Sequence, residues 1–153
     1  MSTEAELAGG PVDTVHQLRA LVVDLHLIGA EFARVNGLHA TDLRALICLL
    51  DAHRNSQVAT PGWLKDQLHL NSASVTALVD RMERLGLMRR ERDVQDRRRV
   101  LLHVTPDAMQ LGRSFFGPVI ESATARIEKY SAAQRRMIDV FLTDMRHAVD
   151  EVD

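Results

Sequence analysis

The stretch that decides the fold is SASVTALVDRMERLGLMRRERDVQDRRRVLLHVT, residues 72–105. Apolar side chains recur at helical spacing from Val75 to Leu85, and Gly86 ends that run. The second part then alternates apolar and polar residues on either side of a short basic tip, which is typical of a β-hairpin. The stretch therefore predicts a helix over about residues 72–86 and a hairpin over about residues 87–104, with strands at 87–93 and 99–104.

Positive charge is concentrated in the same stretch. Between Arg81 and Arg99 the chain has eight arginines and four acids, so this segment has a net charge of +4. The rest of the chain has 11 basic and 17 acidic residues, a net charge of −6, which gives the total of −2. Binding to phosphate requires such a local basic patch rather than a high overall pI.

A short helix is predicted just before this stretch, because Thr60 is a good N-cap and Pro61 suits the first helical position. A short helix, a tight connection and a second helix with a small, polar, basic outer face form the pattern of a helix-turn-helix. A hairpin that follows the second helix is a wing. Its tip, residues 94–98, is short and cationic, which fits a minor groove.

Long helices are predicted on both sides of this domain. Residues 1–11 are expected to form a disordered tail, and an apolar helical period covers residues 12–36. A further helix begins near Thr41 and opens the domain of residues 37–104. Residues 105–153 are predicted to form two helices, with a kink at Pro118 and a capping box from Ser131 to Gln134. The predicted fold is mainly α with a small β-hairpin wing.

Several classes of protein are disfavoured by the composition. No apolar run approaches the length of about 18 residues that a membrane span needs, and the N-terminus lacks the pattern of a signal peptide, so a cytoplasmic protein is expected. The single Cys48 cannot form an internal disulfide and is interpreted as a buried structural thiol. The chain has no catalytic motif, no phosphate loop and no histidine pair at ligand spacing, which predicts no enzyme, no cofactor and no metal site.

The order of elements, together with Asp96-Arg97-Arg98 and Thr105 at the next helix start, resembles the MarR family of bacterial winged-helix regulators from about Val12 to Val149. The resemblance implies a homodimer that is joined through the first and last two helices and binds a pseudo-palindrome in double-stranded DNA. It implies that Ser72, Ser74, Thr76 and Arg81 lie in or beside the major groove. The wider predicted DNA-binding set also includes the basic residues Arg84, Arg97 and Arg98.

The chain departs from the family pattern at two points. Many members have Arg where this chain has Ala77, which puts one DNA contact in doubt, and the wing has Val94 where Pro is common, which predicts a more mobile tip. The resemblance also implies an effector cavity between the first, second and fifth helices. Reasonable lining residues there, for a small phenolic or lipophilic effector, are His26, Arg34, Cys48 and Phe115.

Alternatives stay open at this level. The wing and helix arginines could instead form ion pairs with Glu83, Asp93 and Asp96 on a solvated surface. Besides a repressor that is released by an effector, the pattern allows a regulator that needs no effector. It also allows a helical dimer that has lost DNA binding, for which Ala77 is the only hint.

Overall fold

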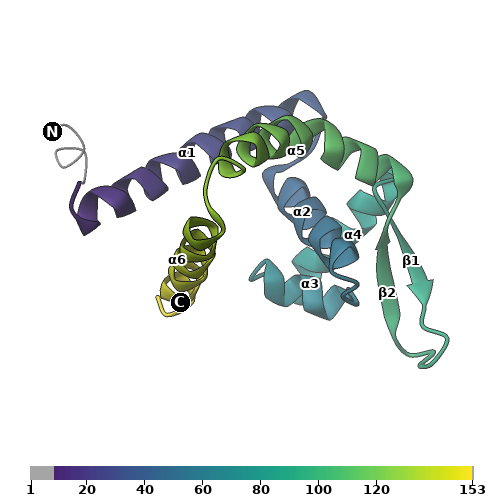
Figure 1. Ribbon diagram of the computed structural model, residues 1–153. Coiled ribbons are helices and arrows are strands. Elements are labelled where there is room, and N and C mark those ends of the chain that lie inside the picture. Colours follow the sequence, from purple (N-terminus) through teal and green to yellow (C-terminus); the bar gives the residue numbers. More distant parts are fainter. Residues whose placement is uncertain (1–8, 153) are drawn as a thin grey trace, which may run out of the picture. The chain divides into compact units, whose positions relative to one another are not determined.

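A computed structural model describes residues 9–152 (Figure 1). Within that range the chain forms six helices and a two-stranded antiparallel hairpin, as the sequence predicts. Residues 1–8 of the predicted tail lie outside the described residues, and Pro11 is already the first residue of helix α1. The chain divides into two compact units, residues 1–110 and 111–153, which are described separately.

The first unit begins with helix α1 (Pro11–Val35), which ends at Asn36 and Gly37, a glycine with a φ of +66°. It continues with α2 (Ala40–Arg54), α3 (Pro61–Gln67) and α4 (Ser72–Arg84). The Thr60 hydroxyl oxygen accepts a hydrogen bond from the Trp63 amide at 3.1 Å, which confirms the predicted start of the short helix.

The core of the winged domain lies between α2, α3, α4 and the hairpin. The largest of its fully buried apolar side chains come from each of these helices and from the first strand: Leu46, Leu64, Leu78, Met82 and Met88. Four of the five apolar residues predicted for the inner face of α4 are buried, but Leu85 is not. Leu85 is the C-cap, one residue beyond the end of α4, and it is 43% exposed.

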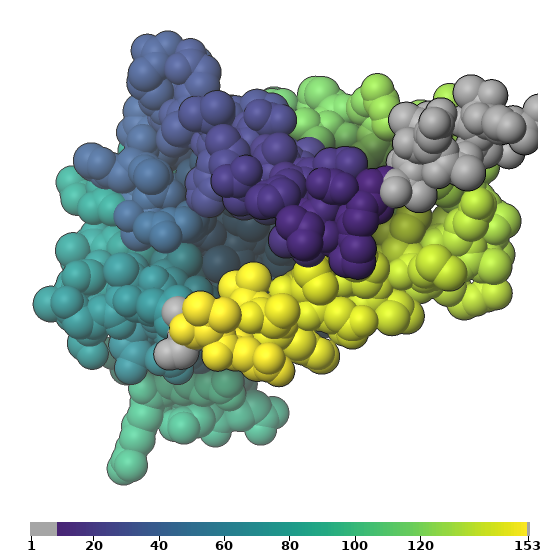
Figure 2. All heavy atoms as spheres, turned by 90° about the vertical axis from the view of Figure 1, so that its left-hand side faces the viewer, coloured from purple at the N-terminus to yellow at the C-terminus, as the bar shows by residue number. Residues whose placement is uncertain are grey.

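The hairpin consists of β1 (Met88–Arg92) and β2 (Val100–Val104), paired so that Met88 lies opposite Val104 and Arg92 opposite Val100. Both strands are one or two residues shorter than the sequence predicts. Hydrogen bonds from the Asp93 amide to the Arg99 carbonyl, at 3.0 Å, and from the Arg99 amide to the Asp96 carbonyl, at 2.8 Å, close the tip. The hairpin projects from the packed helices of its unit (Figures 1 and 2).

Helix α5 (Pro106–Ile127) starts in the first unit and extends into the second, and it stays helical through Pro118. Helix α6 (Ala132–Asp150) starts with the predicted capping box, in which the side chains of Ser131 and Gln134 accept hydrogen bonds from each other's backbone amides. None of the residues of α6 is buried. Among the described residues, no helix has the length and hydropathy that crossing a membrane would require.

Candidate nucleic-acid interface

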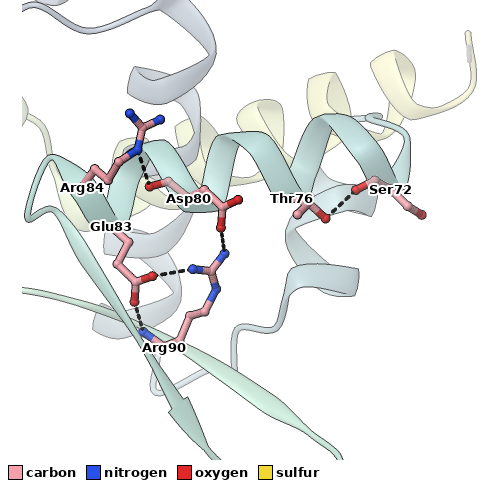
Figure 3. A network of polar contacts seen from close by, with 6 residues as sticks. All are labelled: Ser72, Thr76, Asp80, Glu83, Arg84 and Arg90. Atoms are coloured by element: carbon pink, nitrogen blue, oxygen red, sulfur yellow. Dashed lines mark hydrogen bonds and ion pairs between the residues drawn. The ribbon is translucent and has the colours of Figure 1, made fainter.

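The outer face of α4 is polar and exposed. Ser72, Ser74 and Thr76 are all exposed on it, as is Ala77. The Asn71 side-chain oxygen accepts a hydrogen bond from the Ser74 amide at 2.8 Å, which fixes the start of the helix. The Thr76 hydroxyl donates to the Ser72 carbonyl at 2.9 Å, so its oxygen is held at the helix surface with acceptor capacity left (Figure 3).

The wing tip presents two arginines that lack a carboxylate partner. Arg97 and Arg98 are exposed, and within residues 9–152 neither guanidinium forms an ion pair. Asp96 accepts the Arg98 amide at 3.0 Å, so this carboxylate shapes the turn instead of pairing with an arginine side chain. Arg99 lies 3.7 Å from the carboxylate of Asp93 and braces the base of the tip.

Arg84, at the end of α4, is exposed as well. Its Nε lies 3.4 Å from the Asp80 carbonyl one turn earlier, which is a weak contact (Figure 3). Arg84 and the two tip arginines thus have guanidinium groups that no carboxylate of the described residues neutralises. These groups can meet phosphate without first breaking an ion pair.

Arg81 is arranged differently, because its side chain extends inward to Asp42 at the start of α2. Its Nε lies 2.8 and 3.1 Å from the two carboxylate oxygens, and its Nη2 lies 2.6 Å from Oδ1. This hydrogen bonding raises the pKa of the Arg81 guanidinium. Asp42 is not identifiable from the sequence, because its only local signal is an acid at the third position of a helix and its partner is 39 residues away.

Arg90 joins α4 to the wing (Figure 3). From strand β1 its two Nη groups pair with Asp80 and Glu83, and its amide donates to Glu83 Oε1 at 3.2 Å. The hydrogen bonds to Asp80, and then to Glu83, raise the pKa of Arg90. Strand alternation in the sequence places Arg90 and Arg92 on one face of β1 and Arg89 on the other, but it does not reveal which of them has acidic partners on the neighbouring helix.

Thr105 ties the end of α4 to the start of α5. Its hydroxyl donates to the Gly86 carbonyl at 2.6 Å and accepts the Ala108 amide at 3.1 Å. Its own amide donates to the Leu87 carbonyl at 3.2 Å. The sequence predicts only the helix-capping part of this role.

The residues proposed for an effector site lie in both units. His26 and Arg34 are exposed on α1, and Arg34 pairs with Glu31 at 2.6 Å. Cys48 is half-buried on α2, and burial, followed by the nearby Asp51, raises the pKa of its thiol. Phe115, in the second unit, packs edge-on against Phe116 with ring centroids 4.5 Å apart. Among the residues that the structure describes, no group of three metal-ligating side chains comes together.

Helix α3, the turn after it, helix α4 and the hairpin form a winged helix-turn-helix, which defines the class of the domain. The model of the MarR family matches residues 38–100, from the turn before α2 to the first residue of β2. This part of the chain is therefore similar to the MarR family of transcriptional regulators.

Other known proteins are similar to this chain in sequence or in fold. The uncharacterised HTH-type transcriptional regulator YcgE of Bacillus subtilis is 29% identical over 150 residues, which cover 98% of this chain and 93% of YcgE. A crystal structure of a MepR mutant from a multidrug-resistant S. aureus clinical isolate matches with a TM-score of 0.73 and 18% identity, over 89% of this chain and 96% of that one. A structure of an S. aureus MepR–DNA complex matches with a TM-score of 0.58, also at 18% identity, over 88% and 98% of the two chains.

Proposed function

We propose that this protein is a cytoplasmic, homodimeric repressor that binds double-stranded DNA at a pseudo-palindromic operator and is released by a small-molecule effector. In this proposal α4 enters the major groove and the wing tip enters the adjacent minor groove. The similarity of residues 38–100 to the MarR family supports this proposal.

DNA binding is supported by an exposed polar helix face together with arginines that have no carboxylate partner among the described residues. Ser72, Ser74 and Thr76 offer hydroxyl groups on α4. Arg84 at the end of α4, and Arg97 and Arg98 at the wing tip, offer phosphate-binding groups. Arg90 fixes the wing against α4, so both elements can meet one duplex together. MepR has been crystallised with DNA, which supports the same use of the fold here.

The dimer is supported by apolar side chains that are exposed outside the winged domain. A single chain rarely exposes this many large apolar side chains on one helix, and a second copy is the simplest cover for them. The exposed apolar residues on α1 are Val12, Val15, Leu21, Val22, Val23, Leu25, Leu27, Ile28 and Val35, and those on α6 include Met137, Val140, Leu142 and Val149. In a dimer, two recognition helices about 34–36 Å apart would fit successive major grooves.

A ligand changes operator affinity only if it binds one arrangement of the dimer more tightly than the other. MepR has a structure with bound ethidium bromide, which supports a search for an apolar ligand of this chain. His26, Arg34, Cys48 and Phe115 are the proposed lining residues, and the proposed class of ligand is a small phenolic or lipophilic molecule.

The test is fluorescence anisotropy with the DNA upstream of the protein's own gene, at two salt concentrations and with excess unrelated duplex. We expect tight binding that weakens with salt and resists the competitor. Binding that competitor abolishes, on this DNA and on duplexes selected from a random library, would refute sequence-specific recognition. Titrating candidate effectors into the bound complex then separates a ligand-released repressor from a regulator that needs no effector.

A further inference from the structure

Asp42 is the only charged residue that is buried among residues 9–152. Its carboxylate has hydrogen-bond partners from two separate parts of the domain. It accepts the His39 amide at 2.9 Å and so caps the start of α2, directly after the turn that follows α1. The same carboxylate accepts Nε and Nη2 of Arg81, which comes from the last two turns of α4.

A buried ion pair of this kind does little for net stability, because desolvation of the two charges offsets most of their attraction. Its geometry, however, is restrictive. The planar guanidinium fork must approach the carboxylate edge-on, which limits both the distance and the rotation of α4 relative to the start of α2. The Arg81 side chain is only 30% exposed, since most of it lies along this path to Asp42.

We propose that Asp42 and Arg81 are positioning residues for DNA recognition, and that Arg81 acts on Asp42 and not on DNA. Asp42 sets the angle at which α4 is presented, although it lies outside the recognition helix and the wing. The inference rests on the proposed DNA-binding function. It removes Arg81 from the DNA-contacting set that the sequence predicts and assigns it an internal role.

One guanidinium nitrogen, Nη1 of Arg81, has no hydrogen-bond partner among the described residues. A phosphate contact through Nη1 is therefore the rival explanation. The two differ in salt dependence, because each neutralised phosphate adds about 0.9 to the slope of log affinity against log salt on B-DNA. A residue that only positions the helix contributes nothing to that slope on unrelated DNA.

The experiment compares the full-length protein with Arg81→Gln, Asp42→Asn and the double variant, with Arg98→Gln as the positive control for a lost phosphate contact. Each is measured on a random-sequence duplex and on a duplex that the wild-type protein selects from a random library. Circular dichroism checks that every variant is folded. Arg81→Lys is measured as well, because it keeps the charge and loses the fork, so the proposal stays testable even if Asp42→Asn does not fold.

We expect Arg81→Gln and Asp42→Asn each to lose about tenfold in affinity for the selected duplex, within the range known for coupled contacting residues. The double variant should lose no more than the weaker-binding single variant. On the random duplex, the slope of log affinity against log salt should be the same for Arg81→Gln as for the wild type. The slope of Arg98→Gln should fall by about 1.8, from two arginines per dimer.

A slope for Arg81→Gln that falls like that of Arg98→Gln would overturn the proposal, as would additive losses in the double variant or wild-type affinity in Arg81→Lys. If the wild type shows no salt-dependent binding to any duplex, the proposed function fails and this inference fails with it. If the wild type binds DNA, and the ratio of affinities for the selected and random duplexes is unchanged in the Arg81 and Asp42 variants, only the positioning role is refuted.

Discussion

Replacing Arg90 with alanine tests whether the wing is held to the recognition helix by charge. The substitution removes the ion pairs with Asp80 and Glu83 and leaves these two carboxylates as close neighbours, three residues apart on α4. The side chains of Arg90, Asp80 and Glu83 are 32%, 53% and 41% exposed, so solvent screens both pairs. At such exposure each pair contributes up to about 1 kcal/mol, and like charges at this spacing cost a few tenths more.

The free energy of unfolding of Arg90→Ala should therefore be about 1–2 kcal/mol lower than that of the wild type. Urea denaturation followed by circular dichroism measures this difference. Protomer concentration must be matched, because the stability of a dimer depends on it. Arg92→Ala is the control: Arg92 lies on the same strand, is exposed and has no carboxylate partner among residues 9–152, so its effect should stay within about 0.5 kcal/mol.

Equal midpoints and slopes for Arg90→Ala and Arg92→Ala would refute the reasoning, because they would mean that the pairs to α4 contribute nothing measurable. The urea midpoint of Arg90→Ala should lie below that of the wild type at low salt. Loss of this difference at high salt would support the reasoning further, since salt screens partly exposed ion pairs.

Three further outcomes follow from exposed or half-buried side chains. Arg98→Ala should weaken operator binding by about 1–3 kcal/mol if it makes a defined groove contact, and unchanged affinity with an unchanged salt slope would contradict this assignment. Leu25→Asp and Phe141→Asp should each give a monomer in sedimentation velocity, because an unpaired charge in the proposed dimer interface is costly, and a monodisperse dimer for both would place the interface elsewhere. Because the pKa of the Cys48 thiol is raised, less thiolate is present near neutral pH in the folded protein. Iodoacetamide should therefore modify Cys48 faster in the urea-unfolded protein than in the folded protein, and equal rates would argue against burial.

Most of the fold could be predicted from the sequence because its signals are local. Helix caps at Thr60 and Ser131 are predicted from a few neighbouring residues, and the structure has a side-chain cap at both of them. The hairpin follows from period-two alternation around a polar tip, with an error of only one or two residues at the strand ends. The prediction for Leu85 is wrong because helical periodicity says little about the residue at which the backbone leaves the helix.

The candidate site was less predictable because it depends on contacts between distant residues. Charge density identifies the segment from Arg81 to Arg99, but it does not show which of its arginines are neutralised. The partner of Arg81 is 39 residues away on α2, and those of Arg90 lie on the preceding helix. Both side chains extend toward acids of other elements, whereas Arg97 and Arg98 lie at the tip of a hairpin where no acid reaches their guanidinium groups within residues 9–152.

This division of the arginines makes the salt dependence of DNA binding predictable. Those with carboxylate partners are Arg81, Arg89, Arg90 and Arg99. Those with none among the described residues are Arg84, Arg92, Arg97 and Arg98. Changing the four unpaired arginines to glutamine removes eight cations from a dimer, so the slope on a random duplex should fall by up to about 7. Arg89→Gln/Arg99→Gln is the matched control and should change the slope by less than about 0.9. An equal fall in slope per removed cation in both proteins would mean that the ion pairs open on DNA. Total charge, rather than the partners of each arginine, would then determine binding.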